Sequence, residues 1–163
     1  MKWNKQEWNK AIELLSEVAE YEASCIEYEI EPTTTNSWEE FKKETEKNGY
    51  ITVSMDGCDT SIYDNAVVNR MARVWHDKVH LNNNLSFSLR NEIEVTKIQQ
   101  EDIYNYVKEV KMKNDQDFNI KILELAQKII YIDIAEQLKY YYKHKKFVEN
   151  QKAFVQNILY NEG

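Results

Sequence analysis

Two histidines, His76 and His80, form the pattern in this sequence that is most typical of a chemical site. They are two of only three histidines in 163 residues, and four positions separate them. Residues four apart on an α-helix lie on the same face, one turn from each other. Two imidazole nitrogens on such a face can converge on one metal ion, as they do in helix-borne HExxH zinc sites. The pair therefore indicates a metal site.

The third ligand is expected from the helix that follows. The polar loop at 82–87 is short enough to fold the next helix back antiparallel to the first. Glu92 lies in the first turns of that helix and is the expected third ligand, whereas Glu94 would point to a different side. Two imidazoles and one carboxylate suit Zn²⁺, and Fe²⁺ prefers the same donor set and is the alternative ion.

Other polar residues surround the pair on the helical wheel. Asn69 and Arg73 lie beside it on the wheel. Asp77 lies between the two histidines in sequence and would be a hydrogen-bond acceptor or a base beside the site. The alternative without metal makes His76 and His80 hydrogen-bonded residues at the edge of the core, with Asp77 paired to Arg73. Three residues before this helix are candidates for a fourth ligand on sequence proximity alone: Asp56, Cys58 and Asp59.

Long helices are expected to position these residues. Three glycines and one proline are too few for a sheet-rich fold, which needs many turns. The sequence predicts a mainly α protein, a bundle of about five to six helices in one domain over 1–163, with the metal-site core at 62–98. The expected helices cover about 3–30, 37–48, 62–81, 86–111, 118–142 and 146–160. Alternating residues at 50–55 predict a strand, either in a small β-hairpin with 60–63 through a turn at 56–57 or as extended chain.

The charge balance bears on the class of partner. With 21 basic and 28 acidic residues the net charge is −7, whereas a nucleic-acid binder needs a basic surface. The stretch 139–146 mixes tyrosines and lysines, which bind nucleic acid in some proteins, but the acidic balance favours a helix surface whose rings lie on the core. We therefore expect a protein partner and no direct nucleic-acid binding.

Cysteine use and hydropathy bear on location. Cys25 and Cys58 form no CxxC pair, which fits a reducing cytoplasm. The N-terminal residues are polar from the start and so do not predict a signal peptide. No apolar run approaches the roughly 18–20 residues that cross a bilayer. The expectation is a cytoplasmic protein without membrane contact.

A stretch of about 25 of the 163 residues resembles a pattern in uncharacterised proteins of phages and mobile elements. The pattern is R-x-x-H-D-x-x-H at 73–80, then Phe87-Ser88 and Glu92. The helical, glycine-poor, acidic chain also resembles phage-encoded inhibitors of bacterial immunity, among them metal-binding anti-CRISPR proteins that block the type II effector nuclease. This resemblance implies a zinc-binding, phage-type inhibitor that contacts the CRISPR effector nuclease in the host bacterial cytoplasm. No catalytic residue is carried over from it.

Three functions are compatible with these patterns and with the resemblance. In the first, the protein is no enzyme, and an acidic helix face docks on the positively charged channel of the nuclease while the metal supports the fold. That face carries Glu13, Glu17, Glu20 and Glu27. In the alternative, a zincin-like metallohydrolase, the metal activates water and Asp77 is the base, although it is one methylene shorter than the glutamate of HExxH. An HD-type phosphohydrolase using His76-Asp77 ranks last, because only His144 is left as a further histidine.

Overall fold

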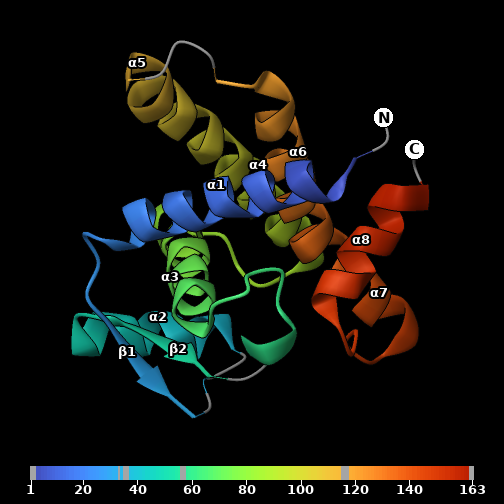
Figure 1. The fold of residues 1–163 in the computed structure, drawn as a ribbon. Helices are drawn as coiled ribbons and strands as arrows, with labels where there is room; N and C mark the ends of the chain where they lie inside the picture. Colours follow the sequence, from blue (N-terminus) through green and yellow to red (C-terminus); the bar gives the residue numbers. More distant parts are fainter. Residues whose placement is uncertain (1–2, 33, 35–36, 56–57, 115–117, 162–163) are drawn as a thin grey trace.

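A computed structural model describes residues 3–32, 34, 37–55, 58–114 and 118–161 of the chain. The described residues form six helical rods and one two-stranded sheet (Figure 1). Four rods are single helices: α1 (Lys5–Ala23), α2 (Trp38–Asn48), α3 (Ala66–Asn83) and α8 (Gln151–Asn161). Two rods continue through π-helical segments. One is α4 (Leu89–Tyr106), η2 (Val107–Lys111) and α5 (Met112–Asn114), and the other is α6 (Ile120–Tyr131), η3 (Ile132–Glu136) and α7 (Gln137–His144). The predicted mainly α bundle is confirmed.

The helix ends follow local capping chemistry. Asn4 and Glu7 form a capping box at the start of α1, and Ser88 accepts a hydrogen bond from a backbone N–H of α4. Gly49 ends α2 at φ +81°, a conformation in which a Cβ is strained. The predicted ends of α3 and α8 need correction, because α3 begins at Ala66 behind the cap Asn65 and α8 begins at Gln151.

The sheet differs from the expected hairpin. Strand β2 (Ile51–Ser54) is present, but it pairs in parallel with β1 (Tyr28–Glu31), so the predicted pairing with 60–63 is wrong. The expected extension of the first helix to residue 30 is wrong for the same reason, since α1 ends at Ala23. Parallel strands need a crossover, and α2 supplies it. The expected turn at 56–57 lies outside the described residues, and Cys58–Thr60 form a short 3₁₀ turn.

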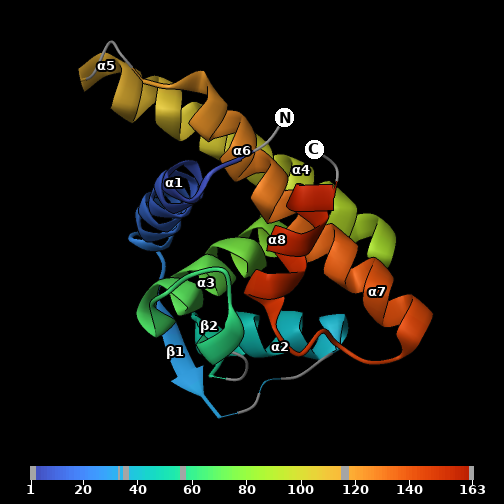
Figure 2. The same cartoon turned by 45° about the vertical axis from the view of Figure 1, so that its right-hand side comes forward.

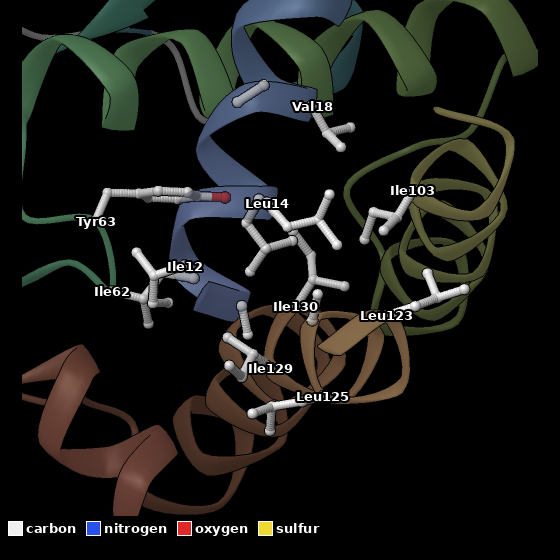
Figure 3. Close-up of a cluster of buried hydrophobic side chains, with 14 of the residues drawn as sticks. Ile12, Leu14, Val18, Ile62, Tyr63, Ile103, Leu123, Leu125, Ile129 and Ile130 are labelled. Carbon is white, nitrogen blue, oxygen red and sulfur yellow. The ribbon is translucent and has the colours of Figure 1, made fainter. Parts of the chain in front are cut away.

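The main core lies between α1, α4 and α6. Leu14 and Val18 of α1 face Ile103 of α4 and Leu123 and Ile130 of α6 (Figure 3). Helix α6 is apolar on nearly all sides, and six of its twelve residues are buried. Each fully buried Leu or Ile side chain contributes about 1.5–3 kcal/mol, so this cluster holds the three rods together.

Helix α3 lies between two layers and thereby positions the site. Figures 1 and 2 show α1 across one side of α3, and the sheet with α2 on the other. Trp75 and Val79 pack into the main core, while Val74 packs into a second cluster with Phe41 and Val53. No helix in the described part of the chain combines the length and apolarity that a bilayer crossing needs.

Candidate metal centre

The structure brings the side chains of His76, His80 and Glu92 together where α3 turns into α4. Asn84 ends α3 in the left-handed conformation, and Ser88 caps α4 four residues later, so α4 folds back beside α3. The two Nε2 atoms lie 3.0 Å apart. Glu92 Oε2 is 3.1 Å from His76 Nε2, and Glu92 Oε1 is 3.4 Å from His80 Nε2. These are the three residues that the sequence nominated as ligands, and one ligand atom from each fits within a 4.8 Å cluster.

The outer ring nitrogens fix which atoms face the centre. His80 Nδ1 lies 2.7 Å from the carbonyl oxygen of Leu85, which can only accept, so Nδ1 carries the hydrogen. His76 Nδ1 lies 3.1 Å from Oε1 of Gln99, a side chain that is 1% exposed. Each neutral imidazole therefore turns the lone pair of Nε2 toward Glu92. Outer hydrogen bonds of this kind orient the imidazole ligands of metal ions.

Three acceptor atoms this close repel one another unless a cation lies among them, and a proton is one such cation. Burial lowers the pKa of His76, but the hydrogen bond and charge of Glu92 outweigh it and raise that pKa to about 9. Burial raises the pKa of Glu92, but the hydrogen bond and the positive charge of His76 lower it to about 2. Without metal, His76 and Glu92 thus form an imidazolium–carboxylate pair at neutral pH.

A zinc ion also fits the spacing. Zinc binds imidazole nitrogen and carboxylate oxygen at about 2.0–2.1 Å, and tetrahedral geometry then separates neighbouring ligand atoms by about 3.3 Å. The separations of 3.0, 3.1 and 3.4 Å in the structure lie around this value. The donor set equally suits Fe²⁺, which takes two histidines and a carboxylate on one face.

One side of the centre is closed by aromatic rings. His80 is fully buried, and its ring centroid lies 5.0 Å from that of Phe87 and 6.1 Å from that of Trp38. The sequence analysis missed Trp38 and Gln99. Gln99 follows Glu92 by seven residues, two turns along the same face of α4, which is a signal that could have found it. Nothing local in the sequence points to Trp38.

The other side opens into a cleft of about 640 Å³, whose lining includes His76 and Glu92 but not His80. Asn69, Arg73 and Asp77, the residues expected beside the pair, also line it. The guanidinium of Arg73 donates to the carbonyl of Ser54, 3.0 Å away, which ties α3 to β2. An ion held at this site would therefore keep one face toward the cleft.

Two buried carboxyl groups in the cleft have raised pKa values. Burial raises the pKa of Asp77 to about 6, although the charges of His76 and Arg73 oppose the shift. Burial also raises the pKa of Asp133, from η3, to about 7, against the hydrogen bond donated by Gln137 over 2.7 Å. Asp133 is more than 50 residues from the histidine pair and was missed in the sequence.

The remaining candidates lie apart from the centre. Asp56 and the side chain of Cys58 lie outside the described residues. Asp59 lines a separate cavity of about 270 Å³. Glu94 is exposed and pairs with Lys97 at 3.2 Å, so it points away from the ligands, as expected.

The acidic face of the first helix is smaller than expected. Glu13 and Glu20 are exposed on α1. Glu17 instead pairs with Lys111 at 2.5 Å, so part of its charge is balanced within the protein. Glu27 lies beyond the end of α1, next to β1, so its placement on this helix face was wrong.

Comparison of the chain with protein-family models, curated proteins and solved structures gives no match. The chemistry of the centre is that of three convergent ligands with one open side. Catalytic zinc sites have this form, with three protein ligands and a water or substrate in the fourth position. Such an ion can activate water or bind an anionic oxygen atom.

Proposed function

We propose that this protein binds one zinc ion through His76, His80 and Glu92, with Fe²⁺ as the alternative ion. The observation that supports this proposal is the convergence of their three ligand atoms at 3.0–3.4 Å, close to the spacing of about 3.3 Å around tetrahedral zinc. The hydrogen bonds from both Nδ1 atoms to Leu85 and Gln99 add support, because they aim Nε2 lone pairs at one point. The ion joins α3 to α4 and so contributes to folding.

Elemental analysis tests the metal proposal. Protein purified without added metal should contain about one equivalent of zinc or iron, and His80→Ala and Glu92→Gln should lose it. His144→Ala is the matched control, since His144 is exposed at the end of α7 and far from the cluster in sequence. If the purified protein contains no metal and added zinc leaves its melting temperature unchanged, the proposal fails.

As its biological role we propose a phage-type inhibitor that binds a host defence nuclease, the type II CRISPR effector. Support comes from the resemblance of the 73–92 stretch, from the net charge of −7, and from Glu13 and Glu20 exposed on α1. Acidic side chains can compete with DNA for the positively charged channel of such a nuclease.

A cleavage assay tests the role. The protein should slow DNA cleavage by the purified effector, and the double variant Glu13→Lys/Glu20→Lys should inhibit at least tenfold less well. Glu124→Lys is the control, because Glu124 is an exposed glutamate on α6. Unchanged cleavage at a large excess of the protein would exclude this nuclease as the partner.

A metallohydrolase is the second candidate, and the cleft is the observation that favours it. Asp77 lines the cleft beside His76 and Glu92, and its carboxylate is the proposed base. Asp77→Asn should retain the metal and abolish turnover on a panel of peptides and phosphoesters. A zinc-loaded protein that turns over no compound on the panel argues for the inhibitor.

A further inference from the structure

The metal centre shares its cleft with a group of aromatic side chains. Tyr141 and Tyr142 of α7 and Phe147, which follows that helix, line the same 640 Å³ cleft as His76 and Glu92. The rings of Tyr141 and Phe147 stack with centroids 4.4 Å apart and an interplanar angle of 21°. Tyr142 is 45% exposed and Phe147 64% exposed, so ring surface remains open at this end.

Lysines surround the aromatic end. The Nζ atom of Lys145 lies 5.6 Å above the ring of Tyr142, and Lys143 and Lys146 are exposed on either side in sequence. The chain as a whole is acidic, with a net charge of −7. These lysines place positive charge beside the aromatic residues, which favours the approach of an anionic ligand.

A divalent ion would add two positive charges at the inner end of the cleft. Arg73 and the carboxyl groups of Glu92, Asp77 and Asp133 line the same space. An anionic ligand would meet the ion there, and Lys145 lies beside Tyr142 at the aromatic end. A phosphate oxygen of such a ligand can take the position on the ion that the protein ligands leave toward the cleft.

We propose that the cleft binds a nucleotide, with a phosphate oxygen on the metal ion and the base on the aromatic rings of Tyr142 and Phe147. The inference rests on the proposed zinc site and adds the class of ligand. A nucleotide joins the two features that the cleft offers at separate places, an anionic oxygen and a flat ring. The cleft volume lies within the roughly 300–1,000 Å³ typical of small-molecule sites. The net charge of −7 disfavours a longer nucleic acid, whose phosphates need a basic surface, so the proposed ligand is the free nucleotide.

Calorimetry on the zinc-loaded full chain tests the ligand class. AMP should bind at least tenfold more tightly than inorganic phosphate or adenosine, since each of these carries half of the contacts. AMP that binds no more tightly than phosphate overturns the inference, and so does a single-stranded pentanucleotide that binds tenfold more tightly than AMP. Zinc content is measured on the same samples, so loss of the zinc site is distinguished from failure of the nucleotide inference.

Variants of the aromatic end test the contact. Tyr142→Leu/Phe147→Leu should lower the affinity for AMP about tenfold, because base stacking on aromatic side chains is lost. The affinity for inorganic phosphate and the zinc content should stay the same. Tyr160→Leu is the matched control, because Tyr160 is an exposed aromatic residue of α8 that is not part of the cleft lining. Unchanged AMP affinity in the double variant overturns the stacking contact.

Discussion

Zinc binding should release the proton that His76 holds in the metal-free protein. The pKa of His76 is raised to about 9 because Glu92 accepts its hydrogen bond and carries a negative charge, which outweigh the effect of burial. Below that pH the metal-free protein carries the proton on Nε2, the atom that faces the ion. Zinc and this proton therefore compete, and the affinity for zinc rises with pH.

The size of the effect follows from the distance between the working pH and the pKa. At pH 7, about two units below a pKa of about 9, nearly all metal-free molecules hold the proton, which weakens the apparent zinc affinity about 100-fold, or about 3 kcal/mol. The affinity should rise about tenfold from pH 6.5 to pH 7.5. The binding should release close to one proton from His76 for each zinc ion.

Titration calorimetry in two buffers of different ionisation enthalpy measures the proton release directly. Glu92→Gln removes the charge that raises the pKa of His76, so release at pH 7.5 should fall well below one proton and zinc should bind more weakly. Asp133→Asn is the control variant. The carboxyl group of Asp133 has a raised pKa of about 7 and could itself release a proton when zinc binds. Any proton release that remains in Asp133→Asn therefore does not come from Asp133.

A zinc affinity that does not change between pH 6.5 and pH 7.5, with no proton release, would refute the reasoning. It would mean that no proton lies between His76 and Glu92 in the metal-free protein. The three acceptor atoms would then have to remain at 3.0–3.4 Å without any cation, against their mutual repulsion.

Three further predictions concern stability. Burial raises the pKa of Asp133 from 3.8 to about 7, so the ionised carboxylate destabilises the fold and the unfolding free energy should fall as pH rises from about 4 to 7. In denaturant titrations, Asp133→Asn should remove this decline and raise the unfolding free energy at pH 8 by up to about 4 kcal/mol. Trp75→Phe should lower that free energy by about 2–3 kcal/mol, because the fully buried indole donates to Asp102 over 2.8 Å and the carboxylate would lose its donor; unchanged urea midpoints would show that water replaces it. Gly49→Ala should lower the unfolding free energy by about 1 kcal/mol in the same assay through backbone strain alone, since a Cβ at this position meets no atom within 4 Å. An unchanged unfolding free energy would mean that residue 49 does not have the left-handed φ of +81°.

The helices and the cluster of His76, His80 and Glu92 could be predicted because their signals are local. Four-residue spacing brings His76 and His80 together on α3, and a short loop brings Glu92 back to them. Cap residues such as Ser88 mark helix starts whatever the rest of the fold does. The carboxylate and imidazoles are thus brought together by chain geometry over fewer than 20 residues.

Strand β1 could not be predicted in this way. Ile26, Tyr28 and Ile30 alternate with glutamates, which is the period of a strand, but Ile26 also continues the apolar positions of α1. What decides between the two is pairing with β2, in which Tyr28 lies opposite Ile51. A partner more than 20 residues away, beyond α2, leaves no mark in the local pattern.

The cleft could not be predicted from the sequence for a related reason. Asp133 faces the cleft because the rod of α6, η3 and α7 packs against α4. The side-chain amides of Gln100 and Gln127 each donate a hydrogen bond of 2.8 Å to the other residue's carbonyl, which fixes how the two rods align. The π-helical turn η3 then directs Ile132 into the core and leaves Asp133 in the lining of the cleft. π-Helical turns often occur at functional sites.

The asymmetry of the centre bears on what a bound metal ion would do. A purely structural zinc ion is normally enclosed by four protein ligands, whereas the described residues gather three, with rings of Phe87 and Trp38 closing only the side of His80. The side of His76 and Glu92 opens into a cleft with space for a ligand. An inhibitor that acts only through the surface of α1 has no use for that opening. If the protein is such an inhibitor, the open cleft points to a second role for the centre, the binding of a small ligand, which the AMP titration tests.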